Sequence, residues 1–306
     1  MELRLLRYFI VLAEELHFGR AARRLSITQP PLSFGIRQLE EYLGGRLFER
    51  DSRRVILTSM GTAFLLEAIR TVAQARIAEE TARAIAGGRA GSLQIGFTGS
   101  MLYRGMPEIL DLFSQSHPGI DIRLMDMTVA EQAVALQQFR IHCGFTPAES
   151  VAPGLSGQAL APDAFVCCVP EKHWAANRRR IRLESLASED FIIFSREITP
   201  AGYDHVLQLC LAAGFAPRER AFVRQWLTAV ALVSKGVGIA IVPSTMRQAI
   251  SRNVRFIPID GTGTETAGYF MWHPKAVSPA LELLGSTVQA YLQSSVRRPR
   301  RRSAAA

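Results

Sequence analysis

The chain has 306 residues, of which 48% are hydrophobic, and its formal net charge is +9. The length predicts two or three domains, and the hydrophobic content excludes a disordered chain. Four cysteines without CxxC spacing exclude a disulfide-rich secreted protein and fit a reducing cytoplasm. The charged N-terminal segment is typical of neither a signal peptide nor a membrane span, so no membrane partner is expected.

The positive charge is unevenly distributed along the chain. Residues 1–88 carry 13 arginines against 10 acidic residues, whereas residues 89–296 carry 18 basic and 17 acidic residues. Residues 297–306 begin with the run RRPRRR and are expected to form a disordered basic tail. A polyanion is therefore the predicted partner of the N-terminal part, and the tail either contributes to that binding or is unspecific.

Residues 1–58 predict a winged helix-turn-helix domain. Apolar residues recur at helical spacing over 3–16, FGRAARRLS predicts a second short helix, and Thr28 is the expected N-cap of a third. Pro30 and Pro31 fit the first turn of that third helix, which is expected to end at Gly44-Gly45. The stretch RLFERDSRRVILT then predicts a two-stranded basic wing.

The third helix carries an aromatic residue and a glycine, Phe34 and Gly35, where a solvent-facing surface is expected. If this helix enters the major groove, its outer residues face base edges and the wing arginines face phosphates. Phe34 then packs either on a thymine methyl or against protein, and Gly35 is expected to permit close approach of the backbone to DNA. The predicted DNA contacts are Gln29, Pro30, Pro31, Ser33, Phe34, Arg37, Arg50, Arg53 and Arg54. Arg53 and Arg54 are either phosphate contacts or a solvated turn.

The rest of the chain predicts a long helix followed by an α/β region. Residues 59–88 form the expected linker helix, whose apolar residues, Leu65 and Ile69 among them, exceed what a winged domain can bury, so a partner helix is expected. From residue 91 strands and helices alternate, with one helix expected over 101–116, which predicts parallel sheets covered by helices. This region, 91–296, divides into lobe I, about 91–161 and 266–296, and lobe II, about 162–265.

The order of these elements resembles that of LysR-type transcriptional regulators. The strongest similarity lies in AARRLSITQPPLSFGIRQLEEYLGGRLFER, followed by LTSMG at the start of the linker and, more weakly, ALVSKGVGIAIVP at 231–243. The resemblance implies an α/β fold class with an all-α winged helix-turn-helix N-terminal domain, a dimerising linker helix and a two-lobed effector domain like periplasmic binding proteins. It further implies a cytoplasmic homotetramer whose partners are double-stranded promoter DNA and a small-molecule effector. The family usually has an arginine where Phe34 stands.

Effectors of this family bind between the lobes, and ligands of open sheets bind beyond the carboxyl ends of strands. The predicted effector contacts are Thr98, Ser100, Met101, Thr128, Phe145, Ser195, Arg196, Tyr203 and Gln225. Each serine or threonine there either contacts the effector or only caps its helix. Relatives that bind aromatic diacids carry a basic residue where Thr146 stands, so either Arg196 supplies that charge or the effector is less anionic. A carboxylate or aromatic metabolite is expected.

Enzymatic function is not expected. The sequence lacks the GxxxxGKS/T, GxSxG and HExxH motifs, and its six histidines are scattered without metal-ligand spacing. No cofactor and no metal are therefore predicted. The alternative is a solute-binding or transport-type two-lobe protein, against which the winged helix and the missing signal peptide argue.

Overall fold

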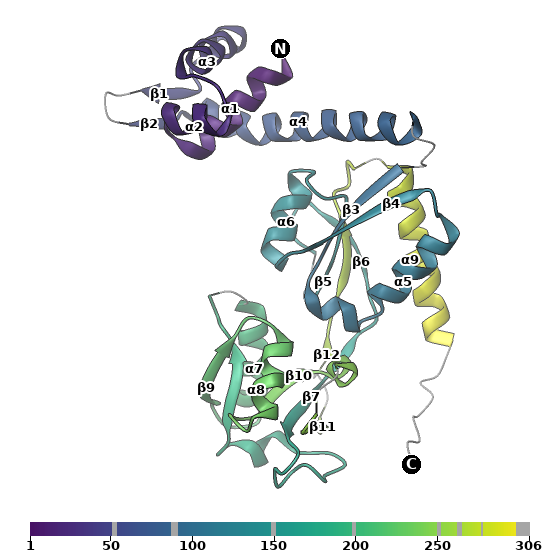
Figure 1. Cartoon of the computed structure of the whole chain (residues 1–306). Coiled ribbons are helices and arrows are strands. Elements are labelled where there is room, and N and C mark those ends of the chain that lie inside the picture. The colour runs from purple at the N-terminus through teal and green to yellow at the C-terminus, as the bar shows by residue number, and fades with distance from the viewer. Residues whose placement is uncertain are drawn as a thin grey trace. The chain divides into compact units, whose positions relative to one another are not determined.

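The computed structural model describes residues 1–50, 54–86, 91–147, 151–197, 200–249, 252–261, 265–276 and 278–297 (Figure 1). Two compact units divide the chain, the first made mainly of Met1–Ser92. The α-helices are α1 (Leu3–Glu15), α2 (Phe18–Arg24), α3 (Gln29–Leu43), α4 (Ser59–Ala86), α5 (Met106–Ser116), α6 (Val129–Gln137), α7 (Pro200–Ala212), α8 (Trp226–Ser234) and α9 (Pro279–Arg297). Within the described part of the chain, no helix is long and apolar enough to cross a membrane.

The strands and 3₁₀ helices complete the fold. The strands are β1 (Phe48–Arg50), β2 (Val55–Leu57), β3 (Gly91–Phe97), β4 (Ile120–Asp126), β5 (Cys143–Thr146), β6 (Ser156–Ala159), β7 (Asp163–Pro170), β8 (Asp190–Phe194), β9 (Arg218–Val223), β10 (Ala240–Pro243), β11 (Val254–Pro258), β12 (Glu265–Thr266) and β13 (Tyr269–Trp272). The 3₁₀ helices are η1 (Gly99–Tyr103), η2 (Leu183–Leu186) and η3 (Ser244–Gln248).

A single apolar core holds the winged unit together. The ring of Phe9 in α1 lies 5.5 Å from that of Phe48 in β1 and 5.4 Å from that of Phe64 in α4. The carboxylate of Glu40 in α3 accepts hydrogen bonds from the backbone N–H groups of Leu47 (2.9 Å) and Phe48 (3.2 Å). Because β1 and β2 pair in antiparallel register, these contacts fix α3 against the wing. The predicted helices and wing are all present.

Gly35 does not do what the sequence predicts. It is buried, and a Cβ atom at this position would lie 2.8 Å from Cδ2 of Tyr8 and 3.2 Å from Cδ2 of Leu5. The glycine therefore allows α1 and α3 to pack closely, and the prediction that it opens the backbone to DNA is wrong. Phe34, by contrast, is 66% exposed, so its ring lies outside the core of its winged unit.

The linker helix α4 is partly covered by its own winged unit. Phe64, Leu65 and Val72 pack against the winged core, and Ala68 is buried there. Leu65 therefore packs against the core of its own unit while remaining partly exposed, which the sequence does not indicate. Leu66 remains 39% exposed on the same helix.

Lobe I is built on the five-stranded sheet β4-β3-β5-β13-β6. β3 and β5 run parallel, whereas β13 runs antiparallel to both β5 and β6. Buried residues of α5 and α9 share one core with this sheet, and α6 lies on the other side (Figure 1). Since β13 comes from the C-terminal end of the chain, lobe I is assembled from two separate segments.

Lobe II has β7 at the centre of its main sheet, with antiparallel neighbours β10 and β11. β12 pairs with the start of β7, at Ala164 and Asp163. β8 and β9 form a parallel pair, which is linked to this sheet through reciprocal backbone hydrogen bonds of Ile239 with Ile192 (2.8 Å) and Asp190 (2.9 Å). Two buried clusters, on either side of β7, form its core.

Two sequence predictions of local structure in this region are wrong. The lobe I sheet is mixed, and every strand that pairs with β7 in lobe II is antiparallel to it, which alternation along the chain does not reveal. The helix expected over 101–116 is interrupted at Arg104-Gly105, where Gly105 has a φ of +87°. That conformation ends η1 and begins α5 in a new direction.

Candidate nucleic-acid interface and ligand site

The outer face of α3 is open to solvent. Gln29, Pro30, Pro31 and Arg37 are exposed and Ser33 is half-buried. Two prolines occupy the first turn, where α3 has no intrahelical acceptor for an N–H group. Thr28 stands at the N-cap position but makes no side-chain capping bond. Proline has no N–H, so of the first four positions only Thr28 and Gln29 can offer a backbone donor to an anion such as a DNA phosphate.

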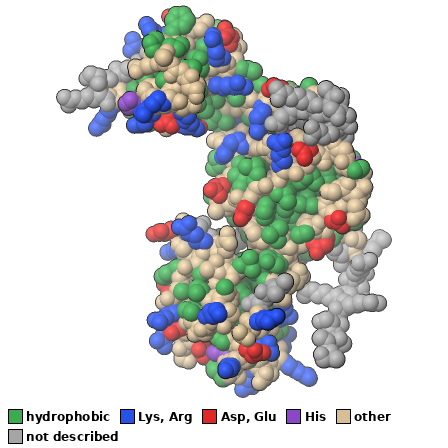
Figure 2. Space-filling view, in the orientation of Figure 1, with side chains coloured by type: hydrophobic (Ala, Val, Ile, Leu, Met, Phe, Trp, Pro, Cys, Tyr) green, Lys and Arg blue, Asp and Glu red, His purple; other side chains and the backbone are tan. Residues whose placement is uncertain are grey.

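The wing places further basic groups beside α3 in the same unit. Arg54 is exposed at the start of β2. Arg53 and the side chain of Arg50 lie outside the described residues. Figure 2 shows basic side chains, which in this part of the sequence are all arginines, on the surface of the winged unit, as a surface that binds a polyanion requires.

In lobe I, two predicted effector residues meet at the end of β3. The hydroxyls of Thr98 and Ser100 are 3.1 Å apart, and both residues are half-buried. The backbone N–H of Thr98 donates to the carbonyl of Phe145 (3.2 Å), which joins the ends of β3 and β5. The hydroxyl pair is therefore held on two strands and not on a free loop.

Three other predicted residues of lobe I have structural roles. Met101 and Phe145 are completely buried in the lobe I core, so their side chains serve packing. The Thr128 hydroxyl and the Glu131 carboxylate form a reciprocal capping box at α6, with bonds of 2.8 to 3.2 Å. For Thr128 the structure thus shows the capping alternative.

Gln132 organises the same edge of lobe I, although the sequence analysis missed it. Its side-chain amide is completely buried and donates to the carbonyls of Met127 (3.2 Å) and Phe145 (3.3 Å). Its oxygen would lie 2.4 Å from a Cβ atom at Gly144, so the glycine is needed for this arrangement. A glutamine in an otherwise ordinary helix gives no local signal of this role.

In lobe II, the predicted cation is already paired. Arg196 forms an ion pair with Asp204 (3.2 Å), and its guanidinium lies 5.5 Å from the centroid of the Tyr203 ring. The Tyr203 hydroxyl donates to Glu219 (2.6 Å), and this hydrogen bond raises the pKa of Tyr203. Ser195 donates its backbone N–H to Val223 (2.9 Å). A ligand carboxylate can bind Arg196 only by competing with Asp204.

Gln225 occupies the N-cap of α8 without a side-chain capping bond, and it is exposed. Its side chain is therefore available for a ligand. Arg224, directly before it, is also exposed and was missed as a candidate cation, although it too follows β9 in the sequence.

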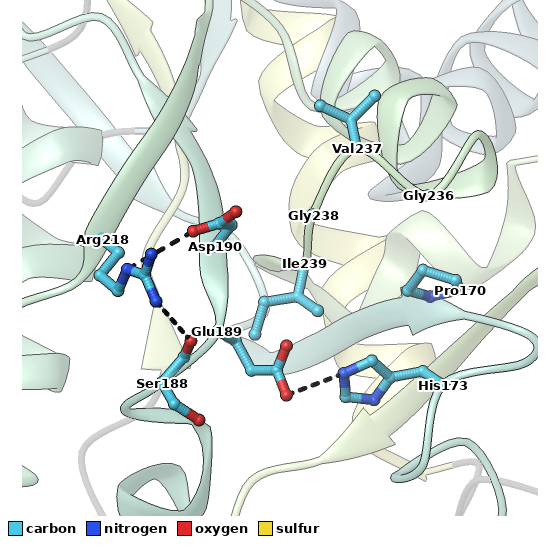
Figure 3. A pocket seen from close by; sticks show the side chains of 10 residues that line it. All are labelled: Pro170, His173, Ser188, Glu189, Asp190, Arg218, Gly236, Val237, Gly238 and Ile239. Carbon is cyan, nitrogen blue, oxygen red and sulfur yellow. Dashed lines mark hydrogen bonds and ion pairs between the residues drawn. The ribbon is translucent and has the colours of Figure 1, made fainter.

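A separate hollow of about 230 Å³ lies within lobe II and contains none of the predicted effector residues. Its charged side chains pair with one another, as Figure 3 shows: Arg218 with Asp190 (3.6 Å) and Glu189 with His173 (3.2 Å). The N–H of Trp174 also donates to Glu189 (2.8 Å). These pairs join the segments around Pro170, η2 and β8, so the hollow is a structural junction of lobe II.

A winged helix-turn-helix followed by a long helix and a two-lobed α/β domain defines a class of ligand-responsive DNA-binding regulators. Residues 3–62 match the family model of the bacterial regulatory helix-turn-helix proteins of the lysR family, and residues 86–293 match the LysR substrate binding domain. The chain belongs to the LysR family of transcriptional regulators. The members of this family regulate transcription and are not enzymes.

Curated relatives and solved structures agree with this assignment. The chain is 35% identical over 282 residues to the HTH-type transcriptional regulator CatR of Pseudomonas putida, covering 92% of this chain and 96% of CatR. It is 35% identical over 260 residues to AlsR of Bacillus subtilis, covering 85% and 86%. The structure of full-length CbnR complexed with its target DNA has a TM-score of 0.70 and 30% identity, covering 95% and 99%. The effector binding domain of BenM with its effector benzoate has a TM-score of 0.60 and 25% identity, covering 68% and 96%.

Proposed function

We propose that this regulator binds double-stranded promoter DNA through α3 and the wing, and that an effector bound between the lobes changes those contacts. The observation that carries the proposal is the exposed outer face of α3, which presents Phe34 and Arg37 from a helix anchored on a buried core. The related CbnR is known as a complex with its target DNA. A recognition helix of this kind contacts base edges with a few outward side chains.

For DNA recognition we assign different roles to the helix and the wing. Arg37 can donate two hydrogen bonds to a guanine, and Phe34 can contact a thymine methyl. Gln29, Pro30, Pro31 and Ser33 lie at the start of α3, near the first phosphates or bases that the helix meets. Arg54, and with it Arg50 and Arg53, are proposed phosphate contacts, which position the protein without reading sequence.

For the effector, we propose a carboxylate or aromatic metabolite held by both lobes. The Thr98–Ser100 hydroxyl pair would serve lobe I, and Ser195, Tyr203 and Gln225 would serve lobe II. The benzoate bound to the BenM effector domain supports this ligand class. Because Arg196 already pairs with Asp204, a monoanion is favoured over a diacid: its single charge can be balanced without displacing Asp204, by Arg224 or by helix N–H groups.

We also propose a homotetramer in the cytoplasm, formed from dimers paired through α4. Support comes from the exposed apolar side chains Met60 (36%) and Leu66 (39%) on that helix. An isolated helix with such residues gains by packing on a second copy. Leu66→Asp should reduce the sedimenting mass, whereas an unchanged mass would exclude this part of α4 from the interface.

A footprint of the purified protein on the DNA upstream of its own gene tests the proposed function. We expect protection of a sequence with two-fold symmetry at protein concentrations that leave random DNA unprotected. Thermal-shift screening of small carboxylates and aromatics should then find a ligand that alters the footprint. Ser100→Ala should abolish the alteration and keep the ligand-free footprint. Absence of any specific protection would contradict DNA recognition, and a normal ligand response in the variant would contradict the site.

A further inference from the structure

The two segments that connect the lobes meet at one side chain. The chain leaves lobe I after β6 and returns to it through β12 and the residues before β13. The Arg104 guanidinium donates to the carbonyl of Ala161 on the outgoing segment (2.9 Å). It also donates to the carbonyls of Thr266 (3.1 Å) and Ala267 (3.0 Å) on the returning segment. One planar guanidinium group thus joins the two segments that cross between the lobes.

The backbone of Arg104 belongs to the segment that carries the candidate effector residues. It is the C-cap of η1, the 3₁₀ helix that contains Ser100 and directly follows Thr98. Tyr103, one residue earlier, packs against the buried cluster of lobe II on the side of α8. The Arg104 side chain thus connects η1 directly to both crossing segments, so a movement of η1 on ligand binding would act on them.

Arg104 is half-buried, and its bonds to Thr266 and Ala267 are partly shielded from water, whereas Ala161 is exposed. Burial lowers the pKa of Arg104, and the nearby charge of Asp163 opposes that shift. Asp163 is itself 2% exposed at the start of β7 and accepts hydrogen bonds from the hydroxyls of Ser244 (2.6 Å) and Thr245 (2.5 Å) in η3. The opposite charges of lobe I and lobe II thus lie near each other at the crossing.

The returning segment is shaped to receive the guanidinium. A Cβ atom at Gly268 would lie 3.2 Å from Cζ and Nη1 of Arg104 and 3.3 Å from Nη2. The Gly268 carbonyl accepts the N–H of Leu160 (2.8 Å), which holds the two crossing segments together on the lobe I side. Alanine at Gly268 would press on the guanidinium without removing any of its donors.

We propose that Arg104 is the positioning residue of the lobe hinge: it fixes both crossing segments to the turn that holds Ser100, and so couples effector binding to the angle between the lobes. The effector part of this statement rests on the proposed function. Lysine cannot substitute fully, because an ammonium lacks the planar fork that reaches carbonyls on two segments at once.

The distance between the lobes in the ligand-free, full-length protein tests the hinge directly. Spin labels attach to cysteines introduced at Ser114 in α5 and Lys172 after β7, which are both exposed. The four native cysteines are buried and should stay unlabelled. Labelled protein is mixed with excess unlabelled protein, so that only distances within one chain are measured.

We expect Arg104→Met to broaden or shift the distance distribution, Arg104→Lys to give an intermediate result, and Gly268→Ala to shift it with all donors present. Arg123→Met is the matched control, since Arg123 is an exposed arginine of lobe I paired only with Asp121 among the interactions described. A wild-type distribution in folded Arg104→Met would overturn the proposal. If that variant does not fold, a wild-type distribution in both Arg104→Lys and Gly268→Ala would overturn it equally.

The result is separable from that of the proposed function. The distance measurement needs neither operator nor effector, so it can support the hinge even if no footprint is found. Conversely, a specific footprint together with an unchanged distance distribution would support the proposed DNA-binding function and contradict the hinge role of Arg104. Operator affinity without ligand should persist in Arg104→Lys, because the winged unit has its own core.

Discussion

Replacing Asp163 by alanine should destabilise the effector domain far more than removing an exposed carboxylate would. Its side chain is 2% exposed and accepts hydrogen bonds from Ser244 Oγ (2.6 Å), Thr245 Oγ1 (2.5 Å) and the Thr245 N–H (3.3 Å). Removal leaves three donors of η3 without their acceptor and the half-buried guanidinium of Arg104 without its nearby carboxylate.

The magnitude follows from these contacts. A hydrogen bond to a charged group contributes about 1.5–3 kcal/mol, and such bonds within one network are not additive. Removing one partner of a buried charged network typically costs about 3–5 kcal/mol, which we take as the expected loss in the free energy of unfolding. At about 2–4 °C per kcal/mol for a domain of this size, the midpoint should fall by roughly 6–20 °C.

Thermal and urea unfolding of the full-length protein, followed by circular dichroism, would measure this loss. Asp121→Ala is the matched control, because Asp121 is 36% exposed and its ion pair with Arg123 (3.3 Å) lies at the surface. Exposed pairs contribute about 0.2–1 kcal/mol. Asp163→Asn should fall between the two, since the amide oxygen keeps one acceptor. An Asp163→Ala loss no larger than that of Asp121→Ala would refute the reasoning.

Other predictions concern DNA and the thiols. Arg37→Ala should weaken binding to the specific site by about 1–3 kcal/mol. Arg54→Ala should weaken binding to all duplexes alike and reduce the slope of log affinity against log salt concentration by about one. Equal losses of affinity for specific and random DNA in titrations of both variants would contradict this division. Phe34→Ala should leave the melting midpoint unchanged, because the ring is 66% exposed, yet alter the selected binding sequence. Burial raises the pKa of Cys168 and of Cys210 to about 12, so little reactive thiolate forms below that pH and Ellman's reagent at pH 8 should label the native thiols only on unfolding.

The winged unit could be predicted closely because its signals are local. Prolines at the start of α3 and Gly44 at its end, with a φ of +75°, mark the helix in the sequence itself. That Gly35 lies on the buried face of α3 could not be predicted, because this depends on its packing against Tyr8 of another helix. Helical periodicity gives the mean direction of an apolar face, and it does not decide whether a residue at the boundary of that face is buried or exposed.

The lobes were predictable in outline and not in strand direction. β11 pairs Val254 with Pro170, residues that are far apart in sequence, and no local pattern records such a pairing. The same holds for the candidate site: Thr98 and Ser100 could be proposed from the sequence because they follow a recognisable strand. Gln132, Arg104 and Asp163 were missed because their roles depend on which distant carbonyls and hydroxyls the fold brings to them.

The position of β13 determines when lobe I can be completed during synthesis. Its residues pair with β5 on one side and β6 on the other, so it is an inner strand of the sheet although it is made near the end of translation. Until then β5 and β6 expose unpaired edges while all of lobe II is being made, and such edges invite association with other chains. The nascent regulator therefore carries a finished DNA-binding head, with its own core, long before its first lobe can close. A chain that stops before Tyr269 should retain the folded DNA-binding domain and an incomplete lobe I sheet. We expect such a chain to aggregate and not to act as a ligand-free regulator.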